Sequence, residues 1–60
     1  GSQLVSIGNL KPGMELLEDL FAGNGIKLLP KGCVLTEIMI NRIHDLHSVI
    51  AQREIRIKSN

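Results

Sequence analysis

The fold of this chain depends on one stretch, Met14–Leu29, which reads MELLEDLFAGNGIKLL. Its first half is compatible with two structures. In a helix, the leucines share one face with Phe21, opposite the three acidic residues. In a strand, the large apolar side chains alternate between both faces, so both faces must be partly covered or the strand must contain a bulge near Glu18–Asp19.

The loop after this half favours the strand. Asn24-Gly25 lies inside a short glycine-flanked loop, and Asn-Gly is the strongest short-range signal for a β-hairpin. Ile26–Leu29 then supplies a returning strand of β-branched and apolar residues. We therefore expect Met14–Phe21 to pair with Ile26–Leu29.

Two proline-glycine turns flank this hairpin. Pro12 fixes φ at the first central position of a turn, and Gly13 supplies positive φ at the second, which suits a type II turn. Pro30, followed by Lys31 and Gly32, forms the second turn, because proline cannot donate to a strand ladder. Cys33–Leu35 then resumes an extended conformation.

A helix is expected from Glu37 to about His47. Thr36 is placed as its N-cap, and Glu37 lies in the first turn, where the helix dipole favours an anion. Leu35 and Ile40 have the spacing of a hydrophobic staple. Apolar residues then continue at helical spacing.

Short strands are expected at the two ends of the chain, Gln3–Ile7 and Arg53–Lys58, because apolar and polar residues alternate there. The predicted fold class is α+β, a small, mainly antiparallel sheet of about four short strands with one helix packed across it. The predicted core is aliphatic: Val5, Ile7, Met14, Leu16, Leu20, Ile26, Leu28, Leu35, Met39, Ile43, Leu46, Ile55 and Ile57.

Size and composition limit the classes of function. Sixty residues form one domain at most, and a hydrophobic fraction of 43% is hard to bury in so short a chain. Some apolar surface is therefore expected to contact a partner, either a neighbouring domain or a second copy. Gly1-Ser2 resembles the remnant of a cleaved tag, so the expected module spans 3–60 and is excised from a larger protein.

Charge and cysteine content indicate the environment. A net charge of +1 gives no strong electrostatic attraction to nucleic acid or to an anionic membrane. No apolar run approaches the roughly 20 residues that span a bilayer. Cys33 is the single cysteine, so an intrachain disulfide is excluded, and a reducing, cytoplasmic environment is expected.

A search for chemistry finds incomplete sites. His44 and His47 are spaced to reach one ion from a helix, but the sequence supplies no further cluster of ligands. Cys33 lacks the surroundings of a nucleophile and is expected to be a small buried apolar residue. We therefore expect no catalytic residue, no metal site and no cofactor.

Three basic residues near the C-terminus form the one candidate binding site. Arg53, Arg56 and Lys58 make a short basic stripe. One interpretation is a charged strand edge that prevents pairing between sheets. The other is a contact for a small anion or a nucleotide, although the stacking aromatics of single-strand binders are missing.

Five motifs follow one another along the chain: Asn9–Met14, Glu18–Leu20, Leu28–Gly32, Val34–Glu37 and Ile40–Ile43. Taken in order, they resemble a known bacterial module. It accompanies receiver-domain response regulators and signalling proteins with HD-type phosphohydrolase domains, including those that act on cyclic di-GMP. The likeness extends over about Val5 to Lys58 and departs at Leu17, where a small residue is expected, and at Cys33, where threonine or a similar residue is expected.

The resemblance implies a function without catalysis. The same pattern is similar to a small hybrid-barrel segment in the largest subunits of bacterial RNA polymerase, a likeness of folding more than of function. The histidines and aspartates of an HD phosphohydrolase and the phosphoacceptor setting of a receiver are absent, so those activities belong to the parent protein. The expected function is a regulatory module of a two-component phosphorelay protein that mediates self-association or domain contact. The alternative is a module that senses a small anion or nucleotide through its basic strand.

Overall fold

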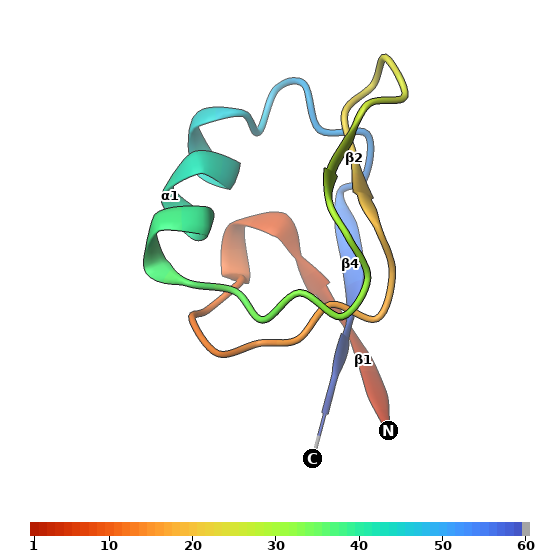
Figure 1. Ribbon diagram of the computed structural model, residues 1–60, viewed down its shortest axis with the longest axis vertical. Helices are drawn as coiled ribbons and strands as arrows, with labels where there is room; N and C mark the ends of the chain where they lie inside the picture. The colour runs from red at the N-terminus through yellow and green to blue at the C-terminus, as the bar shows by residue number, and fades with distance from the viewer. Residues whose placement is uncertain (60) are drawn as a thin grey trace.

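The computed structural model describes residues 1–59, and Asn60, the last residue of the expected module, lies outside them. Two antiparallel pairs of strands, β1–β4 and β2–β3, lie beside one helix (Figure 1). The α+β class is confirmed, but the single sheet of about four strands is not what forms, since the strands make two separate pairs. The elements are β1 (Ser2–Ser6), the 3-10 helix η1 (Ile7–Asn9), β2 (Leu20–Phe21), β3 (Lys27–Leu29), α1 (Glu37–Asp45) and β4 (Glu54–Lys58).

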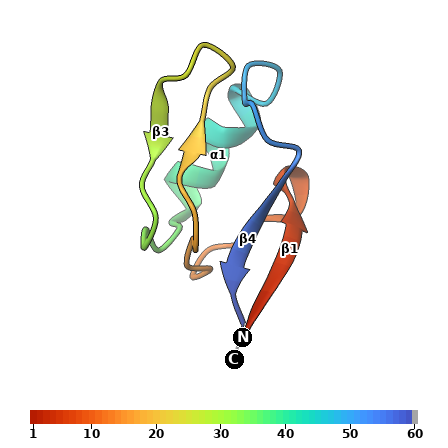
Figure 2. The same ribbon diagram turned by 90° about the vertical axis from the view of Figure 1, so that its right-hand side faces the viewer.

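A short extended segment, 15–17, lies between β4 and the chain that follows β3, and it is hydrogen-bonded to both. On one side it bonds β4, where the Leu17 amide donates to the Arg56 carbonyl at 2.9 Å. On the other side the Leu16 amide donates to the Cys33 carbonyl at 2.9 Å. Strand β4 therefore has a neighbour along both edges, and β1 is the outer strand of its pair (Figure 2).

The ambiguous half of the hairpin is extended, as expected, but bent. Leu16 and Leu20 are both completely buried, as one face of a strand requires, and the chain bends between them at Leu17–Glu18. The irregularity in pairing lies further along than expected. Leu20 pairs with Leu29 and Phe21 with Lys27, so the extra residue is on β3 rather than near Glu18–Asp19.

Both proline-glycine turns form as predicted. Gly13 and Gly32 have φ of 90° and 89°, and each turn is closed by an amide that bonds the carbonyl three residues earlier, at 3.2 Å. The hairpin loop differs from the two-residue Asn-Gly turn. It has three residues, with the Gly25 amide bonded to the Ala22 carbonyl at 2.9 Å and positive φ at Gly25 alone. Asn24 instead accepts the Ile26 amide on its side-chain oxygen at 3.1 Å.

The helix begins where the sequence predicts. Thr36 Oγ1 accepts the Met39 amide at 3.2 Å, which confirms the N-cap. The helix ends at Asp45, two residues before the predicted His47, and Leu46 already has non-helical backbone angles. A series of turns then leads to β4.

Most of the predicted core is buried, and two of its residues are not. Ile26 is 60% exposed because it lies beside the hairpin tip, and Leu46 is 42% exposed because it lies beyond the last helical residue. Met14, Leu28 and Met39 are only half-buried. Three buried residues are absent from the predicted set: Leu10, Ala22 and Ile40.

The first two residues belong to the fold, contrary to expectation. Ser2 is the first residue of β1 and pairs with Lys58. The Gly1 carbonyl accepts the Ser59 amide at 2.9 Å, so the two ends of the described chain lie side by side (Figure 2). At the other end of β1, Ile7 begins η1 instead of continuing the expected strand.

Candidate interaction surfaces

The basic stripe predicted from the sequence is divided between two surfaces. Arg56 and Lys58 lie on the exposed face of β4, where Ile55 and Ile57 alternate with them and are buried. Arg53 precedes β4 and lines a groove elsewhere. The interpretation as a charged sheet edge is wrong for β4, because that strand is paired on both sides.

The groups around Arg56 make an anion site at Arg56 and Lys58 less favourable. Its guanidinium Nη1 donates to Ser2 Oγ at 3.4 Å, and its backbone amide donates to Glu18 Oε1 at 3.3 Å. Glu54 lies on the same face of β4. With these carboxylates beside it, the surface carries little net positive charge.

The groove that contains Arg53 also contains both histidines. It has a volume of about 650 Å³ and lies between η1 and the turns after α1. His47 Nδ1 donates to the His44 carbonyl at 3.0 Å, which leaves Nε2 as the other ring position for a partner. Two imidazoles and a guanidinium can hold a small anion when the histidines are protonated. The carbonyl end of α1 lies beside them and opposes such binding.

The histidines and Cys33, which suggested metal or thiol chemistry, do not form a complete site among the described residues. Within residues 1–59, no three His, Cys, Asp or Glu side chains are grouped so as to hold a metal ion. Cys33 Sγ lies 3.6 Å from Met39 Sδ and is half-buried against α1. Cys33 packs against apolar neighbours as a small residue does, but it is less buried than expected.

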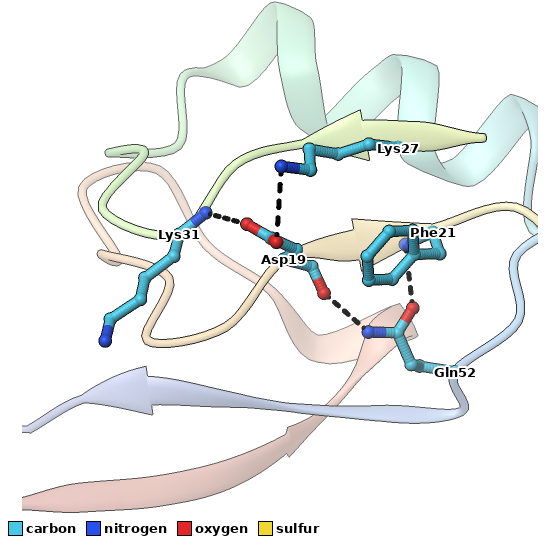
Figure 3. Close-up of polar contacts among 5 residues, drawn as sticks. All are labelled: Asp19, Phe21, Lys27, Lys31 and Gln52. Carbon is cyan, nitrogen blue, oxygen red and sulfur yellow. Dashed lines mark hydrogen bonds and ion pairs between the residues drawn. The ribbon is translucent and has the colours of Figure 1, made fainter. Parts of the chain in front are cut away.

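A polar cluster that the sequence did not reveal joins β2 to the segment before β4 (Figure 3). Gln52 Nε2 donates to the Asp19 carbonyl at 2.7 Å, and Gln52 Oε1 accepts the Phe21 amide at 2.9 Å. The Asp19 carboxylate accepts the Lys31 amide at 2.7 Å and pairs with the Lys27 ammonium at 3.4 Å. The Lys31 amide, and then Lys27, hold the pKa of Asp19 below its usual value.

Exposed apolar side chains are the most prominent feature of the surface. Among the described residues, seven large ones are at least 36% exposed, and Ile38 reaches 70%. Four of them lie on the β2–β3 hairpin or on the turns after α1, two segments that are joined where the Gly23 amide donates to the Val49 carbonyl at 2.7 Å. We call these four the hairpin-end cluster: Phe21, Ile26, Leu46 and Val49. The other three are Leu4, Val34 and Ile38.

Comparison of this chain with protein-family models, with curated proteins and with solved structures found no match. The resemblance to a bacterial signalling module therefore stays a prediction. In the part of the chain that the structure describes, no helix has the length and apolar character needed to cross a membrane.

Proposed function

We propose that this chain is a non-catalytic interaction module that binds a second copy of itself, within a cytoplasmic two-component signalling protein of bacteria. The observation that carries the proposal is the exposure of seven large apolar side chains among the described residues, against eleven apolar residues that are buried in the core. A contiguous exposed apolar patch is typical of a protein that has a partner, and four of the seven residues lie on the hairpin or on the turns that are hydrogen-bonded to it. The order of the turn and helix motifs supports the choice of signalling protein.

The balance of burial also supports self-association. The core is entirely aliphatic, and a 60-residue chain buries a smaller share of its surface than larger domains do, so its own fold is only marginally stable. Covering part of this exposed apolar surface in a dimer adds stability of the same kind as the core provides. We therefore take a second copy of the same chain as the partner.

Sedimentation velocity tests the proposal directly. We expect the sedimentation coefficient of the chain to rise from the monomer value to the dimer value between about 10 μM and 1 mM, the range of weak interfaces. A dye that binds apolar surface should fluoresce less as the dimer forms. A monomer at every concentration, with no dye binding, contradicts the proposal.

A second candidate function is the sensing of a small anion, and it is favoured by one observation. Arg53, His44 and His47 line the same groove, which Arg56 and Lys58 do not. Inorganic phosphate added at pH 6 should shift the NMR signals of these three side chains, and Arg53→Gln should remove the shifts. Shifts at Arg56 and Lys58 instead place anion binding on β4, and the absence of shifts excludes this function.

A further inference from the structure

The two strand pairs have outer edges that differ in their protection. The edge of β3 carries Lys27, contains the bulge and ends at Pro30. Charged residues, bulges and prolines are the devices by which proteins stop a sheet edge from pairing with another chain. β1 has none of them, since its five residues are Ser, Gln, Leu, Val and Ser, all uncharged.

The hydrogen-bond pattern shows which groups of β1 are free to pair. The Ser59 amide donates to the Gly1 carbonyl, and the Ile7 amide donates to the Arg53 carbonyl. Hydrogen-bonded pairs alternate along an antiparallel ladder, so the odd-numbered residues of β1 bond β4. The amides and carbonyls of the even-numbered residues point away from β4. Within residues 1–59, nothing lies hydrogen-bonded to this outer edge.

The side chains of these even-numbered residues are exposed as well. Ser2 and Ser6 flank Leu4, whose side chain is 51% exposed on the outer face of the ribbon. The even-numbered positions are also symmetric about Leu4, with a serine two residues away on each side, whereas Gln3 and Val5 on the opposite face differ. A strand of this kind is complementary to itself when turned around its centre.

From these observations we infer that β1 pairs antiparallel with β1 of a second copy, about a two-fold axis at Leu4. The inference rests on the self-association proposed above and names the surface that performs it. Each Leu4 faces Leu4 of the other copy, and Ser2 faces Ser6. About six backbone hydrogen bonds form, and the two β1–β4 pairs become one continuous sheet of four strands.

Electrostatics permit this arrangement. The charged residues of the ribbon lie on β4, one strand away from the edge. In the dimer, Arg56 and its symmetry mate are separated by three strand spacings, about 14 Å. That separation exceeds the Debye length of about 8 Å at physiological salt, so repulsion between the two charges is screened.

The test uses two matched substitutions, Leu4→Glu and Ile38→Glu. Both replace an exposed apolar residue by an acid, and Ile38 is the more exposed of the two. Leu4→Glu keeps the fold, because the new acid lies across from Arg56 within the same chain. In the dimer it places two carboxylates next to each other at the axis. We expect the dimer Kd to weaken by about tenfold or more for Leu4→Glu and to stay within about twofold for Ile38→Glu.

Amide hydrogen exchange locates the contact independently of any substitution. The Leu4 and Ser6 amides should exchange more slowly as the protein concentration rises, whereas the Val5 amide, which already bonds β4, should not change. A dimer that tolerates Leu4→Glu and shows no protection at Leu4 overturns the pairing through β1 but leaves self-association standing. A chain that stays monomeric up to 1 mM overturns both.

Discussion

Replacing Gln52 by alanine tests whether one side chain holds the bent hairpin to the rest of the molecule. The change removes two hydrogen bonds to the backbone, those to the Asp19 carbonyl at 2.7 Å and from the Phe21 amide at 2.9 Å. Each contributes about 0.5–1.5 kcal/mol net, so the expected loss is about 1–3 kcal/mol. At about 0.05–0.15 kcal/mol per residue, the whole chain has a stability of only about 3–9 kcal/mol.

Urea unfolding followed by circular dichroism measures this loss. For a domain of this size, we expect the midpoint to fall by about 1 M or more with an unchanged slope. Gln3→Ala is the matched control, because Gln3 is an exposed residue of β1 and its truncation should cost less than about 0.5 kcal/mol. If the two variants unfold at the same urea concentration, the bonds of Gln52 do not stabilise the fold and the reasoning is refuted.

Gln52→Glu separates the donor from the acceptor. At pH 7 the carboxylate still accepts the Phe21 amide, but it has no proton to donate to the Asp19 carbonyl. Protonation restores a donor, so the fold raises the pKa of the new carboxyl above its unfolded value of about 4.3. A group whose pKa is raised in the folded state stabilises the fold when the pH is below its unfolded pKa, and this stabilisation is lost as the pH rises through its folded pKa. The deficit of this variant relative to wild type should therefore shrink between pH 6 and pH 4.

Three further predictions concern single residues. Gly13→Ala should destabilise the fold by about 1–2 kcal/mol, because φ at this position is 90°. Gly8→Ala is the control: the space around its Cβ is equally open but its φ is not positive, so the change should be neutral or stabilising by up to about 1 kcal/mol. Thermal unfolding measures both effects. Thr36→Ala should cost about 1 kcal/mol in urea unfolding through loss of the helix cap, and Thr36→Ser only a few tenths; equal losses would mean that the hydroxyl is not the capping group. Asp19→Asn should make the stability of the fold depend less on pH in the acid range. The pKa of Asp19 is lowered in the fold, chiefly by the Lys31 amide, so its carboxylate stabilises the fold above about pH 4. This stabilisation is lost as the pH falls through the pKa of Asp19 in the folded state. Melting temperatures of both proteins from pH 2 to pH 6 check this, and parallel curves would contradict it.

Local signals predicted the parts of the fold that are decided within a few residues. Pro12 and Gly13 specify their turn by backbone angles alone, and Thr36 caps the helix through an amide three residues away. The alternation of Ile55 and Ile57 with charged residues identified β4 and its buried face. None of these features depends on how distant segments meet.

The features that the sequence did not reveal all depend on distant contacts. Gln52 is hydrogen-bonded to Phe21 and Asp19, which are 31 and 33 positions earlier in the sequence. No local pattern around Gln52 predicts these partners. The helix pattern continues through Leu46, but the chain turns off after Asp45 and exposes that side chain. The single basic stripe did not form, and strand alternation alone separates its members, because it places Arg53 on the face of Ile55 and Ile57, opposite Arg56 and Lys58. What alternation does not show is that Arg53 lies in a groove with the histidines.

The two ends of the described residues, 1–59, meet, and this has a consequence for how the chain can be joined to other proteins. Gly1 and Ser59 are hydrogen-bonded to each other, and the loop after β2 lies at the opposite end of the molecule (Figure 1). Asn24, within this loop, is exposed. A host protein can therefore accept the whole unit within one of its loops, entering and leaving at adjacent points, with little strain on its own structure. By the same geometry, a circular permutant that joins the two ends by a short glycine linker and opens the chain at Asn24 should fold.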